Sequence, residues 1–156
     1  MTTFVLQNIE ETTALGQKLG ALLKSGDCIV LTGELGTGKT AFTKGIAVGL
    51  GIDQMIKSPT YTIVREYHQG RLPLYHMDVY RIEDGGLELG LEEYFEGDGV
   101  SIVEWGQQVQ DELPASYLQI KLNYTEIQNE RTIQFIPKGL RATELSDAII
   151  KNMLGV

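Results

Sequence analysis

The chain has 156 residues, about the length of one domain, and its 21 acidic and 13 basic residues give a formal charge of −8. An acidic chain without a cluster of Lys and Arg is a poor candidate for direct nucleic-acid binding, which depends on basic side chains that displace counterions from phosphates. A single cysteine, Cys28, excludes an internal disulfide, and without a leader-like N-terminus or a long apolar run we expect a cytoplasmic protein with no membrane segment.

The chain begins with a predicted strand, a helix and a buried strand. Residues 4–7 predict the first strand, and Asn8 with Glu11 forms a capping-box pattern ahead of leucines at helical spacing. The apolar run at 28–31 lacks polar alternation, which is typical of a strand covered on both faces in a parallel sheet.

A second helix and two strands are predicted next. The helix covers residues 39–50, where Gly45 and Gly49 indicate close packing because glycine inside a helix otherwise costs stability. Residues 61–67 and 72–78 predict the two strands.

The second half of the chain predicts the rest of a mixed sheet with helices packed on it. Residues 83–95 are acidic and weakly helical, and residues 100–104 predict a short strand. Clean alternation at 118–124 and 132–135 predicts an antiparallel hairpin with one solvated face. The last helix is predicted to begin near Thr143.

The strongest motif is a glycine-rich loop between the predicted buried strand and the second helix. Residues 33–40 read GELGTGKT and match the phosphate-loop pattern G-x-x-x-x-G-K-[ST]. Glycines allow the loop to bring its N–H groups against phosphate oxygens, and the helix that follows directs its positive end at the same anion. Lys39 supplies a cation for the β- and γ-phosphates, and the Thr40 hydroxyl is suited to ligate Mg²⁺. A glycine-rich turn that binds nothing is the disfavoured alternative.

The sequence favours ATP as the nucleotide. It contains neither the N/T-K-x-D nor the D-x-x-G motif of GTPases, and no Leu-Ser-Gly-Gly signature of transporter ATPases. Small P-loop kinases usually close an arginine-rich lid, whereas the five arginines here are scattered at 65, 71, 81, 131 and 141.

Two carboxylates are candidates for the second Mg²⁺ anchor, which normally lies at the end of a neighbouring strand. Asp78 ends one predicted strand and Glu104 ends another. A single acidic residue at a strand end is ordinarily only solvated, but two downstream of a phosphate loop favour the functional interpretation. The sequence leaves open which of them contacts the metal directly, acts through water, or orients the attacking water.

Four further features allow two interpretations each. The segment Ser58-Pro59-Thr60-Tyr61 is either ordered by the γ-phosphate or an ordinary entry into a strand. His76 shares a strand face with Asp78 and either bonds into the site or is structural. Trp105 either packs near the nucleotide or fills a gap, and Cys28 is expected to be an inert core residue.

Four motifs in order, GELGTGKT (33–40), SPTYT (58–62), HMDVYR (76–81) and VEW (103–105), resemble the TsaE family, also called YjeE, over nearly the whole chain. These are small ATPases needed for the threonylcarbamoyladenosine modification of tRNA. The resemblance implies an α/β, P-loop NTPase-type three-layer fold with a mixed sheet and a C-terminal antiparallel hairpin. It also implies that residues 1–156 form a single P-loop ATPase domain, that ATP and Mg²⁺ bind, and that the protein assembles with TsaD and TsaB.

The resemblance also implies roles for single residues. Thr40 and Glu104 are associated with the metal in the family, Asp78 is needed for activity, and the stretch matching Ser58 to Thr62 behaves like a switch. Ala41 departs from the second threonine of many members, which puts little in doubt because Thr40 carries the metal hydroxyl. The expected nucleotide-binding residues, including those that flank the nucleotide near the first helix and on a late strand, are Glu10, Thr12, Gly33, Glu34, Leu35, Gly36, Thr37, Gly38, Lys39, Thr40, Ala41 and Arg131.

The hypothesis is therefore in-line hydrolysis of ATP, with Lys39, Asp78 and Glu104 as the catalytic residues. Lys39 and the loop amides neutralise the phosphates, Mg²⁺ held by Thr40 and Glu104 bridges them, and Asp78 organises water or metal coordination. Turnover by the protein alone is expected to be slow because no arginine finger is evident. A small-molecule kinase and a nucleotide-dependent binding module remain the alternatives, and no strong direct binding to tRNA is expected.

Overall fold

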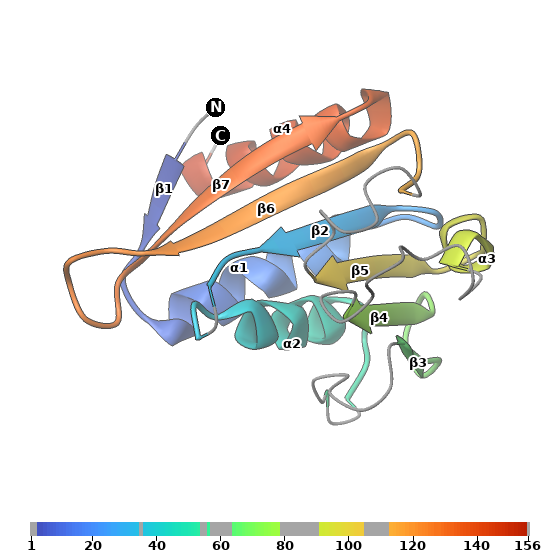
Figure 1. Ribbon diagram of the computed structural model, residues 1–156, viewed down its shortest axis with the longest axis horizontal. Coiled ribbons are helices and arrows are strands. Elements are labelled where there is room, and N and C mark those ends of the chain that lie inside the picture. The colour runs from blue at the N-terminus through green and yellow to red at the C-terminus, as the bar shows by residue number, and fades with distance from the viewer. Residues whose placement is uncertain are drawn as a thin grey trace.

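A mixed β-sheet organises the described part of the chain, with the strand order β1-β7-β6-β2-β5-β4-β3 (Figure 1). The computed structural model describes residues 3–34, 36–53, 56, 64–78, 91–104 and 113–155. The strands are β1 (Thr3–Leu6), β2 (Cys28–Thr32), β3 (Val64–Tyr67), β4 (Leu74–Asp78), β5 (Val100–Glu104), β6 (Tyr117–Tyr124) and β7 (Arg131–Lys138). The helices are α1 (Ile9–Leu22), α2 (Lys39–Gly49), α3 (Leu91–Phe95) and α4 (Leu140–Leu154).

The centre of the sheet is parallel and its edges are antiparallel. β2 lies between β5 and β6 and runs parallel to both, and β4 is parallel to β5. All five residues of β2 are buried, which confirms the strand that its unbroken apolar run predicts. β6 and β7 form the predicted antiparallel hairpin, β1 adds to β7, and β3 pairs with β4.

The sheet carries helices on both faces, as the sequence predicts for a three-layer α/β fold. Helices α1, α2 and α4 cover one face, where the main core includes Leu19, Phe42 and Ile149. Helix α3 covers the other face, where Leu91 and Phe95 pack with Met77 and other strand residues. Among the described residues, no helix is long and apolar enough to cross a membrane.

Helices α1 and α2 pack backbone against backbone at four glycines, Gly16, Gly20, Gly45 and Gly49. A Cβ atom on Gly45 would collide with the carbonyl oxygen of Thr13, and one on Gly20 would collide with that of Ile46. The close packing predicted from Gly45 and Gly49 is thus confirmed. It holds the first turns of the two helices next to each other, and these turns border the loop between β2 and α2.

Helix α4 begins at Leu140, three residues before the predicted start near Thr143. The physical reason lies far away in the sequence, because Ser116 Oγ accepts a hydrogen bond from the N–H of Ala142 at 3.0 Å. Gly139, with φ of 93°, turns the chain into the helix. The first part of the predicted helix at 83–95 and residues 61–63 of a predicted strand lie outside the described residues.

Candidate functional site

The loop between β2 and α2 depends on glycines with positive φ. Gly33, Gly36 and Gly38 have φ of 149°, 82° and 109°, where L side chains are strained. At Gly33 a side chain would also collide with the carbonyl oxygen of Leu122 on β6. The backbone of this loop therefore requires glycine at these three positions, which are the glycines of the phosphate-loop motif.

Hydrogen bonds within the loop fix its shape. The carbonyl oxygen of Glu34 accepts bonds from the N–H of Thr37 at 3.2 Å and from its hydroxyl at 2.7 Å. Lys39 Nζ donates to the carbonyl oxygen of Gly33 at 2.6 Å, so its ammonium lies across the loop. Gly38 at the N-cap of α2 has no side chain to cap the helix, and the first N–H groups of such a helix favour an anion.

The electrostatic surroundings of Lys39 combine burial with two carboxylates. The residue is only 6% exposed, and burial lowers the pKa of its ammonium. The nearby charges of Glu104 and Asp78 oppose that shift, in this order of size, because a negative charge favours the ammonium. Lys39 thus lies within electrostatic reach of both carboxylates, although Asp78 and Glu104 follow it by 39 and 65 positions in the chain.

Asp78 and Glu104 end two adjacent parallel strands. They are register partners of β4 and β5, and Glu104 also pairs with Leu31 of β2. Carboxyl ends of parallel strands meet at one edge of a sheet, which is where ligands bind in open α/β sheets. Glu104 is 6% exposed and Asp78 is half-buried.

The Asp78 and Glu104 carboxylates at this edge are oxygen donors of the kind that Mg²⁺ prefers. Thr40 follows Lys39 in the first turn of α2, and Thr40 and Ala41 line a groove between α1 and α2 together with Glu10. The described residues contain no group of three or more His, Cys, Asp or Glu that could hold a metal ion. Oxygen donors of this kind suit Mg²⁺, which usually takes further oxygens from phosphate groups and water.

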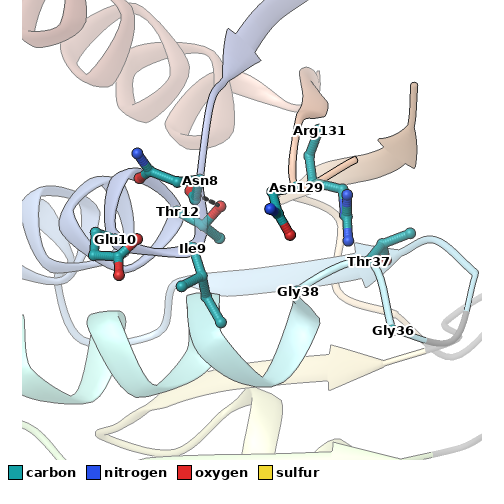
Figure 2. Close-up of a pocket in the computed structure, with 9 residues that line it drawn as sticks. All are labelled: Asn8, Ile9, Glu10, Thr12, Gly36, Thr37, Gly38, Asn129 and Arg131. Carbon is teal, nitrogen blue, oxygen red and sulfur yellow. Dashed lines mark hydrogen bonds between the residues drawn. The ribbon is translucent and has the colours of Figure 1, made fainter. Parts of the chain in front are cut away.

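A pocket of about 380 Å³ lies beside the loop (Figure 2). Three segments line it: the start of α1, the loop, and the β6–β7 connection with the start of β7. Figure 2 shows Arg131 extending from the start of β7 toward Thr37. Its lining residues are Asn8, Ile9, Glu10, Thr12, Gly36, Thr37, Gly38, Asn129 and Arg131.

The structure thus brings together expected residues that lie far apart in the chain. Glu10 and Thr12 of α1 line the same pocket as Arg131. The Thr12 residue is 2% exposed. The Asn8 cap holds this turn of α1, since its Oδ1 accepts the N–H of Glu11 at 2.9 Å. Glu11 Oε2 in turn accepts the N–H of Gln7 at 3.0 Å. In the usual capping box it would accept the N–H of the N-cap residue, which is Asn8.

Sequence reasoning missed several residues near the loop. Asn8, Ile9 and Asn129 line the pocket. Tyr124 also lies beside the loop, since its hydroxyl would be 2.7 Å from a Cβ atom placed on Gly36. The Arg131 guanidinium lies 4.6 Å from the centroid of the Tyr124 ring. The only signal for these hairpin residues is the alternation that predicts the hairpin.

His76 is one of the residues whose role the sequence left open. Its Nε2 lies 2.6 Å from Oε2 of Glu104, and both side chains are buried. The structure therefore joins His76 to the site through Glu104. Leu35, the segment at 58–62 and Trp105 lie outside the described residues.

Cys28 is the buried thiol that the sequence predicts to be inert. It lies in β2 on the α3 side of the sheet and is 3% exposed. Burial, with a smaller effect of the Asp27 charge, raises the pKa of its thiol far above the usual range. It takes no part in the site.

Comparisons with known proteins give one consistent result. A family model described as threonylcarbamoyl adenosine biosynthesis protein TsaE matches residues 6–133. The tRNA threonylcarbamoyladenosine biosynthesis protein TsaE of Bacillus subtilis is 48% identical over 145 residues, which cover 93% of this chain and 91% of the relative. The protein of the same name from Treponema pallidum is 45% identical over 120 residues, 76% of this chain and 88% of the relative. A crystal structure of YdiB from Bacillus subtilis superposes with a TM-score of 0.86 at 42% identity, and covers 97% of this chain and 95% of that one.

Proposed function

The chain belongs to the TsaE family, and from this premise we propose that it is a Mg²⁺-dependent ATPase that supports the biosynthesis of threonylcarbamoyladenosine in tRNA. The names of its relatives support the pathway. The site supports the chemistry: Lys39 in a glycine loop lies close to two carboxylates at the ends of parallel strands. This grouping is the observation that carries the proposal.

The loop and the first turn of α2 bind the triphosphate of ATP. Lys39 exchanges its bond to the carbonyl oxygen of Gly33 for bonds to phosphate oxygens, and loop amides bind the same oxygens. The residues assigned to this cradle are Gly33, Glu34, Leu35, Gly36, Thr37, Gly38, Lys39, Thr40 and Ala41.

The pocket beside the loop receives the nucleoside. Its volume of about 380 Å³ lies in the usual range for small-molecule sites. Glu10 and Thr12 supply oxygen atoms on the α1 side, and Arg131 supplies a cation on the β7 side.

Thr40 and Glu104 would hold Mg²⁺, and Asp78 would orient water at the edge of the sheet where the two carboxylates lie. When bound, Mg²⁺ neutralises charge on the β- and γ-phosphate oxygens. The oxygen of water forms a bond to the γ-phosphorus while the bond between that phosphorus and the ADP oxygen breaks. One proton of the water stays on the phosphate product and the other passes to solvent, which yields ADP and phosphate. Lys39 stabilises the charge that develops on the phosphates.

A partner protein completes the reaction, and we assign that role to TsaD and TsaB. The sequence shows no evident arginine finger, so we expect fast hydrolysis to need a contribution from a partner. The formal charge of −8 favours protein partners over direct tRNA binding.

Reconstituted tRNA modification tests this function. Modification and ATP consumption are followed together, with the wild type, without this protein, and with Lys39→Ala. We expect sustained modification and ADP release with the wild type only. A phosphorylated small-molecule product would indicate a kinase, and full activity of Lys39→Ala would contradict the mechanism.

A further inference from the structure

We propose that His76 is a positioning residue that fixes the carboxylate of Glu104, an inference that rests on the proposed ATPase function. His76 contributes a hydrogen bond and no contact with nucleotide. Its effect passes through the orientation of Glu104.

The contact between the two side chains is short and buried. His76 Nε2 lies 2.6 Å from Glu104 Oε2, with side-chain exposures of 0% and 7%. This distance is at the short end for an N–H donor and a carboxylate, as in charge-assisted bonds. Water therefore does not compete for this bond as it would at the surface.

The register of the sheet produces this contact. His76 of β4 pairs with Ile102 of β5, and Glu104 lies two residues further along β5. Side chains two residues apart on a strand share a face, so both residues project toward α1 and α2. Ile102 and Leu74 on this face belong to the apolar core. On this face His76 and Glu104 thus follow apolar core residues in the direction of the carboxyl ends of the strands.

The other ring nitrogen gives the second observation. His76 Nδ1 is buried and has no hydrogen-bond partner within the described part of the chain. A carboxylate accepts and does not donate, so Nε2 carries the hydrogen of this bond. The core accommodates a polar ring whose single hydrogen bond, as far as the structure describes it, goes to Glu104. Packing alone would be served better by leucine.

This bond holds the carboxylate of Glu104 at one of its two oxygens. With Oε2 bound to His76, the carboxylate is restricted to one orientation, in which it would meet Mg²⁺. Hydrogen bonds to metal ligands commonly affect metal affinity or activity by about 10–100-fold. His76 thus tunes the Mg²⁺ requirement of the site and leaves phosphate binding by the loop unchanged.

The test separates a positioning role from a structural one by the Mg²⁺ requirement. ADP binding is measured by calorimetry without Mg²⁺ and over a range of Mg²⁺ concentrations. The variants are His76→Leu, His76→Gln, whose amide can donate a similar bond, and His68→Gln. His68 is the other histidine of the chain and contacts Glu66 at the surface, so His68→Gln is the matched control.

We expect His76→Leu to need about 10–100-fold more Mg²⁺ for half-maximal effect, with Mg²⁺-free ADP binding unchanged. His76→Gln should lie between this variant and the wild type, and His68→Gln should match the wild type. A folded His76→Leu with the wild-type Mg²⁺ requirement would overturn the inference. Absence of Mg²⁺-dependent binding in the wild type would instead contradict the proposed function, and with it this inference.

A measurement on the wild type covers the case in which His76→Leu does not fold. Nitrogen-15 NMR of the two histidine rings assigns their tautomers. We expect the Nε2–H form for His76 and a change in its ring shifts in Glu104→Gln. An Nδ1–H form that is insensitive to Glu104→Gln would overturn the inference.

Discussion

Asp78 and Glu104 are register partners at the carboxyl ends of β4 and β5, although 26 positions separate them in the chain. Glu104 is also paired with Leu31, so the two carboxylates continue the edge from which the Gly33–Thr40 loop emerges. The parallel centre of the sheet thus places both acids within electrostatic reach of Lys39, and a change in that register would separate the two carboxylates.

This arrangement predicts that neutralisation of Asp78 impairs ATP hydrolysis without abolishing nucleotide binding. Asp78→Asn keeps the size of the side chain and removes its charge, so we expect ATP hydrolysis with partners to fall by about 100-fold or more while nucleotide still binds. Steady-state rates and calorimetric binding are measured on the same preparation. Glu92→Gln, at an exposed position on α3, is the control and should match the wild type. Full hydrolysis by Asp78→Asn would remove that residue from the mechanism.

Lys39→Met should lose nucleotide binding and remain folded. Burial lowers the pKa of the ammonium, which means that its charged form is held at a cost, and methionine removes that cost. Loss of the bond to Gly33 opposes the gain, so we expect a free energy of unfolding within about 1 kcal/mol of the wild type. Thermal unfolding with and without Mg²⁺ and ATP measures both effects. A large loss of stability without nucleotide would contradict this interpretation.

Gly45→Ala should destabilise the protein although alanine is the better helix former. The added methyl group meets the carbonyl oxygen of Thr13, and relief of that overlap requires α1 and α2 to move apart. We expect a loss of about 1–3 kcal/mol, measured by urea unfolding. Val48→Ala, at an exposed position of the same helix, is the control and should change stability by about 0.5 kcal/mol or less. An increase in stability for Gly45→Ala would contradict the backbone contact.

Arg141→Ala should destabilise the protein, because it leaves the buried carboxylate of Asp27 without its cationic partner. Arg141 binds both oxygens of Asp27 at 2.8 Å, and Asp27 has a side-chain exposure of 4%. Removal of the guanidinium leaves that charge without its partner, and because Arg141 itself is 29% exposed we expect about 2–3 kcal/mol of destabilisation. Arg141→Lys should recover only part, since an ammonium cannot match both oxygens. The control is Glu144→Ala, which removes a 3.9 Å surface pair and should have little effect.

Cys28 predicts a loss of stability at alkaline pH. Burial raises its pKa in the folded state, so above the ordinary thiol pKa of 9.0 only the unfolded chain releases the proton. The unfolded state then binds fewer protons, and the free energy of unfolding falls as pH rises, by up to about 1.4 kcal/mol per pH unit. Urea unfolding at pH 8 and 10 should show a smaller fall for Cys28→Ala than for the wild type. Equal falls would show that the thiol does not ionise on unfolding.

The central architecture could be predicted because local sequence patterns determine it. The unbroken apolar run of β2, the alternation of β6 and β7, and the glycines of the loop each have a direct structural cause. The sequence also predicts the ends of β4 and β5, and with them the pair of candidate carboxylates Asp78 and Glu104.

The remaining features depend on contacts that sequence patterns do not contain. Whether His76 reaches Asp78 or Glu104 follows from the β4–β5 register, which no local pattern specifies. The cap from Ser116 that starts α4 early spans 26 positions. Tyr124 lies beside the loop through the pairing of a distant hairpin.

Calorimetric titration with a non-hydrolysable ATP analogue and Mg²⁺ tests the central claim, which is that the Gly33–Thr40 loop binds a triphosphate. The account predicts saturable binding to the wild type and none to Lys39→Met, with thermal unfolding as the check that this variant is folded. Absence of binding to the wild type, or equal binding to Lys39→Met, would contradict it.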